Sequence, residues 1–427
     1  MDNVREEVER VANAAKAASV AMGMTTTEQR NGALRAMASA LREHAPEIVA
    51  ANAADMEAAR AAGTKESLLD RLMLDERRIE GMAGALEDLV ALPDPVGRVL
   101  EDRTLDNGLR VQRVSVPMGV VAVVYEARPN VTADAAGIAL KAGNAVVLRG
   151  GSMAANSNRV VSAVLAGAAE AAGMPAGAIG SINSADRAAT DVLMRLHGVI
   201  DVLVPRGGAG LIAHCVENAR VPVIETGTGN CHTYVQATAD QDCALNIIKN
   251  AKTQRMGVCN ACESVLVDEA IAPEFLPKLV EALGEWGILV HGDEAACAAA
   301  KAAGLAEGAQ YVAGTDEDWG REYLGPEISV KVVSGVREAI AHINRYSTHH
   351  SESIVTADDE AAELFLRAVD SAAVYVNAST RFTDGGEFGL GAEIGISTQK
   401  LHARGPFALE ALTTYKYQVR GEGQVRG

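Results

Sequence analysis

Residues 119–125 read Gly-Val-Val-Ala-Val-Val-Tyr, an uninterrupted apolar run that is followed by helical periodicity over 132–142. A second apolar run, Ala145-Val-Val-Leu148, comes next, and a second helical stretch spans 153–172. Continuous apolar strands that alternate with helices are typical of a parallel sheet with helices on both faces. These residues therefore predict a doubly wound α/β fold, whose ligands lie beyond the carboxyl ends of the strands.

The same alternation continues towards residue 225. We expect further strands at 180–183, 199–204 and 222–225, with helices at 186–196 and 209–219. Upstream of the first strand, Ala, Leu and Met recur at helical intervals, which predicts an all-helical segment. The expected helices there are 3–22, 27–44, 46–62 and 76–91.

Residues 98–104 and 109–116 alternate apolar and polar side chains around Asp106-Asn-Gly108, which predicts a β-hairpin. One face of this ribbon is polar, so the hairpin is expected to project and to pair with another subunit. A second α/β region follows in the C-terminal half. Its expected helices lie around 241–251 and 273–284, and its strands at 264–267, 328–333, 374–377 and 412–419.

Composition limits the classes of function. The chain has 427 residues and a formal net charge of −17, so it offers no basic stripe for the phosphates of a nucleic acid. The N-terminal residues are charged and helical, without an apolar signal core or a membrane-spanning stretch, which predicts a cytoplasmic protein. Six irregularly spaced cysteines in such a chain are expected to stay reduced.

Cys259 stands in a glycine-containing turn just before the strand expected at 264–267. That context is typical of an exposed and positioned nucleophile, and the upstream cations Lys252 and Arg255 could favour its thiolate. Cys259 and Cys262 also form a C-x-x-C pair. Because no second cysteine or histidine pair follows with ligand spacing, we expect no metal site.

Two glycine-rich turns follow predicted strands, Arg149-Gly-Gly-Ser152 and Pro205-Arg-Gly-Gly-Ala-Gly210. Backbone N–H groups there, together with a helix N-terminus, could approach a pyrophosphate. The first turn carries Arg149 and Ser152 where an acidic residue would bind a ribose 2′-hydroxyl, so NADP is favoured over NAD. The cofactor-binding candidates are Arg149, Gly150, Gly151, Ser152, Arg206, Gly207 and Gly208.

Several motifs, in this order and spacing, resemble the aldehyde dehydrogenase superfamily. They are Pro117-Met-Gly-Val-Val, residues 142–148, Glu225-Thr-Gly-Thr-Gly-Asn, Cys259, Glu322-Tyr-Leu-Gly-Pro326 and Val374-Tyr-Val-Asn377. Other segments resemble the γ-glutamyl phosphate reductase family within it, also called glutamate-5-semialdehyde dehydrogenases. These are residues 125–132, Val204-Pro-Arg-Gly-Gly208, Gly229-Asn-Cys-His232, Ala251-Lys-Thr-Gln-Arg255 and Val258-Cys-Asn-Ala261.

The resemblance implies an aldehyde-dehydrogenase-like α/β fold: a Rossmann-type cofactor domain, an α/β catalytic domain and a β-hairpin oligomerisation element. It implies NADPH-dependent reduction of L-glutamyl 5-phosphate to L-glutamate 5-semialdehyde and phosphate, the second step of proline biosynthesis. Cys259 would form a thioacyl intermediate with the substrate.

The resemblance also implies roles for further residues. Asn130 would donate to the oxyanion beside the Cys259 N–H, and Glu322 would hold the nicotinamide ribose. Glu225 matches the glutamate that activates water in hydrolytic members, so here we expect it to be held away from water or to assist proton transfer at the thiol. The basic residues expected to bind the anionic substrate are Arg128, Lys252 and Arg255.

The expected domains are an NADP-binding domain (1–97 and 117–228), a catalytic domain (229–401) and an oligomerisation element (98–116 and 402–427). By resemblance the last strand pairs with a neighbouring subunit, giving a homodimer or larger homo-oligomer. The glycine-rich segment 380–391 is expected near the substrate tail. A functional association with glutamate 5-kinase is also expected.

Two alternatives stay open. The first is a hydrolytic or CoA-acylating aldehyde dehydrogenase of the same fold. The second is a non-catalytic redox sensor that uses a reversible disulfide between Cys259 and Cys262.

Overall fold

A computed structural model describes residues 2–126 and 128–426. The chain folds into two compact units. Unit 1 comprises Met1–Thr226, Gly389–Gly395 and Pro406–Gly427, and unit 2 comprises Gly227–Phe388 and Ile396–Gly405. Unit 2 is therefore inserted into the sequence of unit 1.

Unit 1 is built around a four-stranded sheet in the order β5-β4-β3-β6, and every neighbouring pair is parallel. The strands are β3 (Val120–Tyr125), β4 (Ala145–Gly150), β5 (Ile179–Ser181) and β6 (Val202–Arg206). All six residues of β3 are buried, as the apolar run predicts. The doubly wound fold is confirmed.

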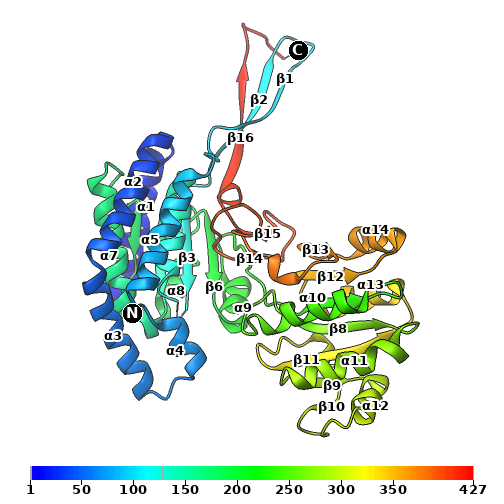
Figure 1. The fold of residues 1–427 in the computed structure, drawn as a ribbon. Coiled ribbons are helices and arrows are strands. Elements are labelled where there is room, and N and C mark those ends of the chain that lie inside the picture. Colours follow the sequence, from blue (N-terminus) through cyan, green and yellow to red (C-terminus); the bar gives the residue numbers. More distant parts are fainter. Residues whose placement is uncertain (1, 127, 427) are drawn as a thin grey trace. The chain divides into compact units, whose positions relative to one another are not determined.

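Helices cover both faces of this sheet (Figure 1). Val120, Ala122 and Val124 pack into one core with apolar residues of α1 and α8. The helices of unit 1 are α1 (Asp2–Met22), α2 (Thr27–Glu43), α3 (Ala45–Ala61), α4 (Glu66–Leu72), α5 (Glu76–Ala91), α6 (Val131–Lys141), α7 (Ala155–Ala171), α8 (Ala188–Leu193) and α9 (Ala209–Asn218). The expected N-terminal helices are confirmed, and the short α4 was not predicted.

The prediction of a strand at 222–225 is wrong. Only an isolated bridge forms there, between Leu203 and Val223. Pro222 has no backbone N–H to give to a ladder, although its carbonyl accepts from the Leu203 N–H at 2.8 Å. The segment therefore touches the sheet edge without extending it.

A three-stranded antiparallel sheet in the order β1-β2-β16 projects from the rest of unit 1 (Figure 1). The predicted hairpin is present as β1 (Val99–Thr104) and β2 (Arg110–Pro117), with Gly108 in the turn at φ 83°. The third strand, β16 (Thr413–Arg420), pairs with β2 of the same chain over its whole length.

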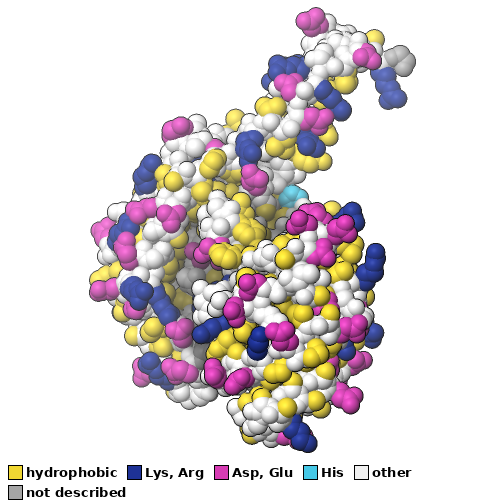
Figure 2. Space-filling model, turned by 45° about the vertical axis from the view of Figure 1, so that its right-hand side comes forward, with side chains coloured by type: hydrophobic (Ala, Val, Ile, Leu, Met, Phe, Trp, Pro, Cys, Tyr) yellow, Lys and Arg dark blue, Asp and Glu magenta, His cyan; other side chains and the backbone are white. Residues whose placement is uncertain are grey.

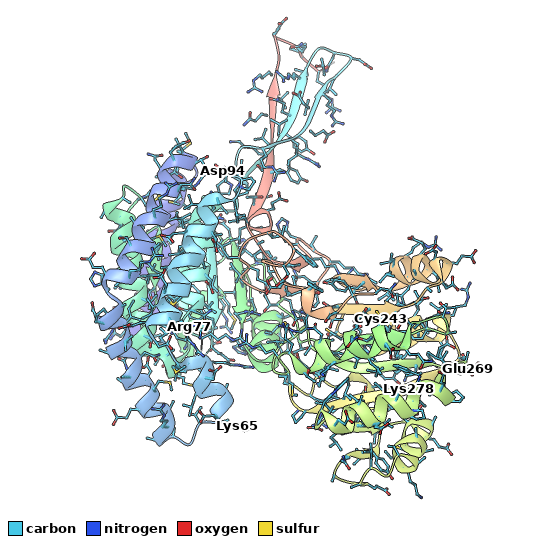
Figure 3. The ribbon with its side chains drawn as sticks, viewed as in Figure 1. Lys65, Arg77, Asp94, Cys243, Glu269 and Lys278 are labelled. Atoms are coloured by element: carbon cyan, nitrogen blue, oxygen red, sulfur yellow. The ribbon has the colours of Figure 1, made fainter. Side chains whose placement is uncertain are left out.

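At the foot of this sheet, Asp94 anchors helix α2 (Figure 3). Its carboxylate accepts from the Thr27 hydroxyl, from the Arg30 guanidinium and from the Val96 N–H at 2.9 Å. Arg30 is only 1% exposed, so this ion pair is largely shielded from water.

Unit 2 contains a seven-stranded parallel sheet in the order β10-β9-β11-β8-β7-β12-β13. The strands are β7 (Cys231–Val235), β8 (Cys262–Asp268), β9 (Leu289–Gly292), β10 (Tyr311–Ala313), β11 (Glu327–Val333), β12 (Ser351–Val355) and β13 (Ala373–Val376). The helices are α10 (Gln241–Thr253), α11 (Ala272–Glu285), α12 (Glu294–Ala302), α13 (Val336–Tyr346) and α14 (Asp359–Ala368). The strands β7, β9, β10 and β12 and the helices α12, α13 and α14 were not predicted.

Acidic and basic side chains are interspersed on the face of the molecule shown in Figure 2. Among the described residues, each helix is too short or too polar to cross a bilayer.

Candidate active site

Cys259 lies in unit 2, in the loop of residues 254–261 that joins α10 to β8 (the nucleophile loop). The Cys259 side chain is half-buried. A turn closed by the Ala261 N–H and the Val258 carbonyl, at 3.1 Å, carries it to the start of β8. The predicted nucleophile therefore stands at the amino end of a central strand, on a loop rather than within the sheet.

The backbone of Cys259 is packed against the segment that leads into β7. A Cβ atom at Gly229 would lie 1.4 Å from the Cys259 carbonyl oxygen, so only glycine fits there. The same oxygen accepts from the buried Cys231 thiol at 3.2 Å. The Glu322 carboxylate, predicted to bind a ribose, accepts from the Gly229 N–H at 2.7 Å.

Lys252 forms an ion pair with Glu263 at 2.5 Å, and both side chains are 0% exposed. Burial raises the pKa of Glu263 to about 7, against the opposing effect of Lys252. The second Glu263 oxygen accepts from the Leu324 N–H at 3.2 Å. Lys252 thus joins α10 to β8 on either side of the nucleophile loop, and this position replaces the predicted contact with substrate.

Asn260, next to the nucleophile, is fixed by the segment Thr380–Thr383. Its side-chain amide donates to the carbonyls of Arg381, at 3.3 Å, and Thr383, at 3.0 Å. The Thr380 hydroxyl donates to the Asn260 carbonyl at 2.8 Å, and the Arg381 guanidinium donates to Asn260 Oδ1. Part of the predicted glycine-rich substrate segment therefore braces the nucleophile loop directly.

Cys262 forms no disulfide with Cys259 in this structure, and its thiol contacts other groups. It is buried in β8, where its thiol donates to the Ser264 carbonyl at 3.3 Å and lies 3.4 Å from the Thr233 hydroxyl. Burial raises the pKa of Cys262 to about 11. Cys259 and Cys262 are both free thiols here.

In unit 1, Arg149 is the last residue but one of strand β4 and is 7% exposed. Its Nη2 atom donates to the carbonyls of Ala185, at 3.3 Å, and Asp186, at 3.1 Å. Its Nε atom is buried and has no acceptor among the described residues. Burial lowers the pKa of Arg149. The Arg149 guanidinium is therefore held in place, and its Nε–H still lacks a hydrogen-bond acceptor among the described residues.

Gly150 follows Arg149, and a Cβ atom there would lie 2.0 Å from Asn158 Nδ2. Gly151 and Ser152 continue the turn into a short 3₁₀ segment, Ser152–Ala154. The glycine at 150 is thus required by its contact with α7.

The predicted pyrophosphate donors were backbone N–H groups at the starts of the two helices that follow the glycine-rich turns. In the structure, carboxylates of the same chain accept hydrogen bonds from N–H groups there. At the start of α7, Asp55 accepts from the N–H groups of Asn156, at 3.2 Å, and Ser157, at 2.8 Å. At the start of α9, Glu126 accepts from the Gly208 N–H at 2.9 Å, and a Cβ atom at Gly207 would lie 2.6 Å from the same carboxylate. These donors already have anionic partners.

The remaining unit 1 candidates surround the start of α6. Asn130 precedes this helix without capping it, and its amide donates to Asp134 at 3.0 Å. Burial raises the pKa of Asp134 to about 6, while Asn130 and Arg206 act in the opposite direction. Arg128 and Glu225 are half-buried.

The structure thus gathers Cys259, Lys252 and Glu322 around one loop of unit 2, and groups Asn130 and Arg206 around Asp134 in unit 1. Sequence reasoning missed Arg381, Glu263, Asp55 and Glu126. Only Arg381 had a signal, since it belongs to a glycine-rich segment already expected near the substrate. Among the described residues, His, Cys, Asp and Glu form no group of three or more suited to a metal ion.

Comparison with known proteins identifies the family to which this chain belongs. Residues 2–302 match the model of the aldehyde dehydrogenase family. The chain is 54% identical to the γ-glutamyl phosphate reductase of Moorella thermoacetica over 424 residues, which is 99% of this chain and 100% of that protein. It is 53% identical to the γ-glutamyl phosphate reductase of Kineococcus radiotolerans, covering 99% and 97% of the two chains.

Solved structures agree. The crystal structure of the γ-glutamyl phosphate reductase from Thermotoga maritima is similar with a TM-score of 0.95 and 46% identity, covering 99% of this chain and 100% of that one. An acetylating aldehyde dehydrogenase from Geobacillus thermoglucosidasius shares the fold at a TM-score of 0.70 and 22% identity, covering 100% and 98%.

Proposed function

Because this chain belongs to the γ-glutamyl phosphate reductases of the aldehyde dehydrogenase family, we propose that it reduces L-glutamyl 5-phosphate to L-glutamate 5-semialdehyde, with NADPH as reductant. This is the second step of proline synthesis from glutamate, a reaction that we place in the cytoplasm. The observation that carries the proposal is Cys259, a half-buried thiol on a loop whose backbone is fixed by Gly229, Cys231 and Thr380.

Cys259 performs nucleophilic catalysis in this scheme. Its thiolate adds to the C5 carbonyl of the acyl phosphate, the bond from carbon to the phosphate oxygen breaks, and phosphate leaves with the electron pair. NADPH, when bound, supplies a hydride to the carbonyl carbon of the resulting thioester. The alkoxide then collapses, the carbon–sulfur bond breaks, and Cys259 recovers its thiolate as the aldehyde leaves. The one proton consumed goes to the departing phosphate.

Two backbone clamps keep the nucleophile in place during these steps. Gly229 and Cys231 hold the Cys259 carbonyl, and Thr380 holds the Asn260 carbonyl. A fixed loop keeps the nucleophile in one position, and the family resemblance implies that the Cys259 N–H donates to the developing oxyanion. Glu322 supports this clamp through Gly229, and we retain for its carboxylate the ribose contact that the family resemblance implies.

The residues of unit 1 fit a phosphorylated cofactor. Arg149 is cationic, and a phosphate oxygen would complete the hydrogen bonding of its buried Nε atom. Gly150, Gly151 and Ser152 follow it. The second predicted cofactor segment, Arg206, Gly207 and Gly208, fits a phosphate less well, because Glu126 already accepts from the Gly208 N–H. The roles of Asn130 as oxyanion donor and of Glu225 at the thiol rest on the family resemblance alone. That of Arg128 as a substrate cation rests on its charge and its position beside Asn130 in the sequence.

The test is run in the reverse direction. Purified protein is given glutamate 5-semialdehyde and NADP, and NADPH formation is followed with and without inorganic phosphate. Cys259→Ala should abolish turnover, whereas Cys243→Ala, at a half-buried thiol on α10 labelled in Figure 3, should leave it intact. Activity that persists without phosphate would refute the acyl-phosphate mechanism and favour hydrolytic chemistry. Activity that persists in Cys259→Ala would refute the role of this thiol as nucleophile.

We also propose that the three-stranded sheet mediates a homodimer or a larger homo-oligomer. Val99, Tyr417 and Val419 are 54%, 55% and 55% exposed on its two edge strands, an unusual set of apolar side chains for a free surface. Tyr417→Glu should shift the protein to a smaller species in sedimentation velocity, and an unchanged sedimentation coefficient would contradict this interface. A functional association with glutamate 5-kinase would follow from the instability of an acyl phosphate in water.

A further inference from the structure

Arg381 is a half-buried cation beside the nucleophile loop, in the 3₁₀ turn Thr380–Phe382 that follows β13. Its Nε atom donates to Gln254 Oε1 at 2.9 Å, and its Nη1 atom donates to Asn260 Oδ1. Both acceptors are neutral amide oxygens. Among the described residues, the Arg381 guanidinium forms no ion pair with a carboxylate. The orientation of the group is therefore fixed, but its positive charge is not neutralised.

A second cation, Arg255, belongs to the same surroundings. Burial lowers the pKa of Arg381, and the nearby charge of Arg255 lowers it further, whereas Cys259 acts in the opposite direction. Asp384 also acts on Arg381, but its Oδ1 atom accepts from the N–H groups of Gly386, at 2.8 Å, and Glu387, at 3.3 Å, in its own turn. Arg255 and Cys259 thus both act on Arg381, and among the described residues neither guanidinium forms a salt bridge with a carboxylate.

Such an arrangement is costly unless an anion joins it, because like charges repel and a half-buried guanidinium loses hydration. A guanidinium presents five N–H donors in a planar fork that matches phosphate oxygens. The Nη2 atom of Arg381 donates to none of the described residues, so it is available for a ligand. The two amide contacts hold the fork in one orientation before the ligand arrives.

We propose that Arg381 and Arg255 form the subsite for the phosphoryl group of the acyl phosphate, next to Cys259. This proposal rests on the proposed function and adds to it the position of the leaving group. The two amide contacts orient Arg381, and Arg255 is exposed at the start of the nucleophile loop. Binding the dianion here places the bond that breaks close to the thiol.

The experiment uses inorganic phosphate as the probe and requires no turnover. The rate of carbamidomethylation of Cys259 by iodoacetamide is measured by peptide mass spectrometry over a phosphate titration, with chloride added to equal ionic strength as the screening control. Phosphate should protect Cys259 in the wild type. Arg381→Gln and Arg255→Gln should each raise the concentration for half-protection by about tenfold or more, the loss of one charge-assisted contact.

Arg337→Gln is the matched control, since Arg337 is exposed on α13. Arg381→Lys separates charge from bracing: it retains the cation but cannot reach both amide oxygens, so protection should stay within about threefold of wild type. Phosphate protection that is unchanged in Arg381→Gln, or absent from the wild type beyond the chloride control, would overturn the subsite. Equal loss in Arg381→Lys and Arg381→Gln would assign Arg381 to bracing alone.

The two proposals fail separately. Phosphate protection without phosphate-dependent turnover would retain the subsite and overturn the proposed function. Phosphate-dependent turnover, together with a Cys259 that phosphate does not protect through Arg381, would retain the proposed function and overturn the subsite.

Discussion

The buried pair of Lys252 and Glu263 makes Lys252→Met the most informative change in unit 2. Met keeps the length and apolar stem of lysine but removes the charge that opposes Glu263. Both side chains are 0% exposed, so water cannot replace the lost partner. Removal of one member of a buried ion pair costs about 3–5 kcal/mol of unfolding free energy.

The cost should depend on pH in a defined direction. In the folded wild type, burial raises the pKa of Glu263 from 4.5 to about 7, so this group lowers stability as pH rises between those values and has no further effect above pH 7. Without Lys252 the folded pKa rises further, because a contribution that lowers it is gone. The decline in stability then continues above pH 7 at about 1.4 kcal/mol per pH unit.

Tryptophan fluorescence is the appropriate assay, because the two tryptophans of the chain, Trp286 and Trp319, both lie in unit 2. Urea unfolding is compared at pH 6, 7 and 8 for wild type, Lys252→Met and the double variant Lys252→Met/Glu263→Leu. The double variant should recover much of the loss, since it leaves no buried charge.

A destabilisation by Lys252→Met below about 1 kcal/mol, or one that does not grow from pH 7 to pH 8, would refute the reasoning. So would a double variant no more stable than Lys252→Met at pH 8, because the isolated carboxylate would then not be the source of the cost.

Three further changes test other parts of the structure. Gly229→Ala should lower kcat at least about tenfold, because its Cβ atom would collide with the Cys259 carbonyl; Gly167→Ala on α7, with open space around the new methyl group, is the control. Asp55→Asn should cost unit 1 about 1–3 kcal/mol in unfolding free energy, measured by circular dichroism, since a buried carboxylate that accepts from α7 is lost. Burial lowers the pKa of His342 to about 3, so wild-type stability falls as pH drops below 6.5; His342→Leu should remove about 2 kcal/mol of that fall between pH 6.5 and 5, followed by tryptophan fluorescence.

Local sequence patterns were sufficient for elements whose conformation does not depend on distant partners. The run 119–125 is buried on both faces, so its side chains carry the signal of a central strand without reference to neighbours. The turn at Asp106-Asn-Gly108 predicts a hairpin for the same reason, because Gly108 adopts the positive φ that the turn requires.

Long-range polar pairing hid other elements. Strand β7 contains His232, whose imidazole and N–H both contact Glu352, a residue 120 positions away. A buried histidine of this kind reads as polar and exposed until its partner is known. The prediction of a strand at 222–225 was wrong for the opposite reason. The apolar pattern was present, but Pro222 has no backbone N–H to donate to the ladder of the sheet.

The same limit applies to the site. Cys259 was identifiable because its turn and the following strand are local, whereas the burial of Lys252 depends on α10 packing beside β8. Arg381 lies 121 residues beyond Asn260, so its contact with the nucleophile loop follows only from the fold. Charge type could be read from sequence, and the partner of each charge could not.

The insertion of unit 2 within unit 1 has a consequence for the chain during its synthesis. Strand β2 ends at Pro117, and its partner β16 begins at Thr413, so the three-stranded sheet cannot close until nearly 300 further residues have been translated. At about 5–20 residues per second, that interval is roughly 15–60 s. Through this time the edge of β2 that will pair with β16 stays open, while the whole of unit 2 is made and can fold.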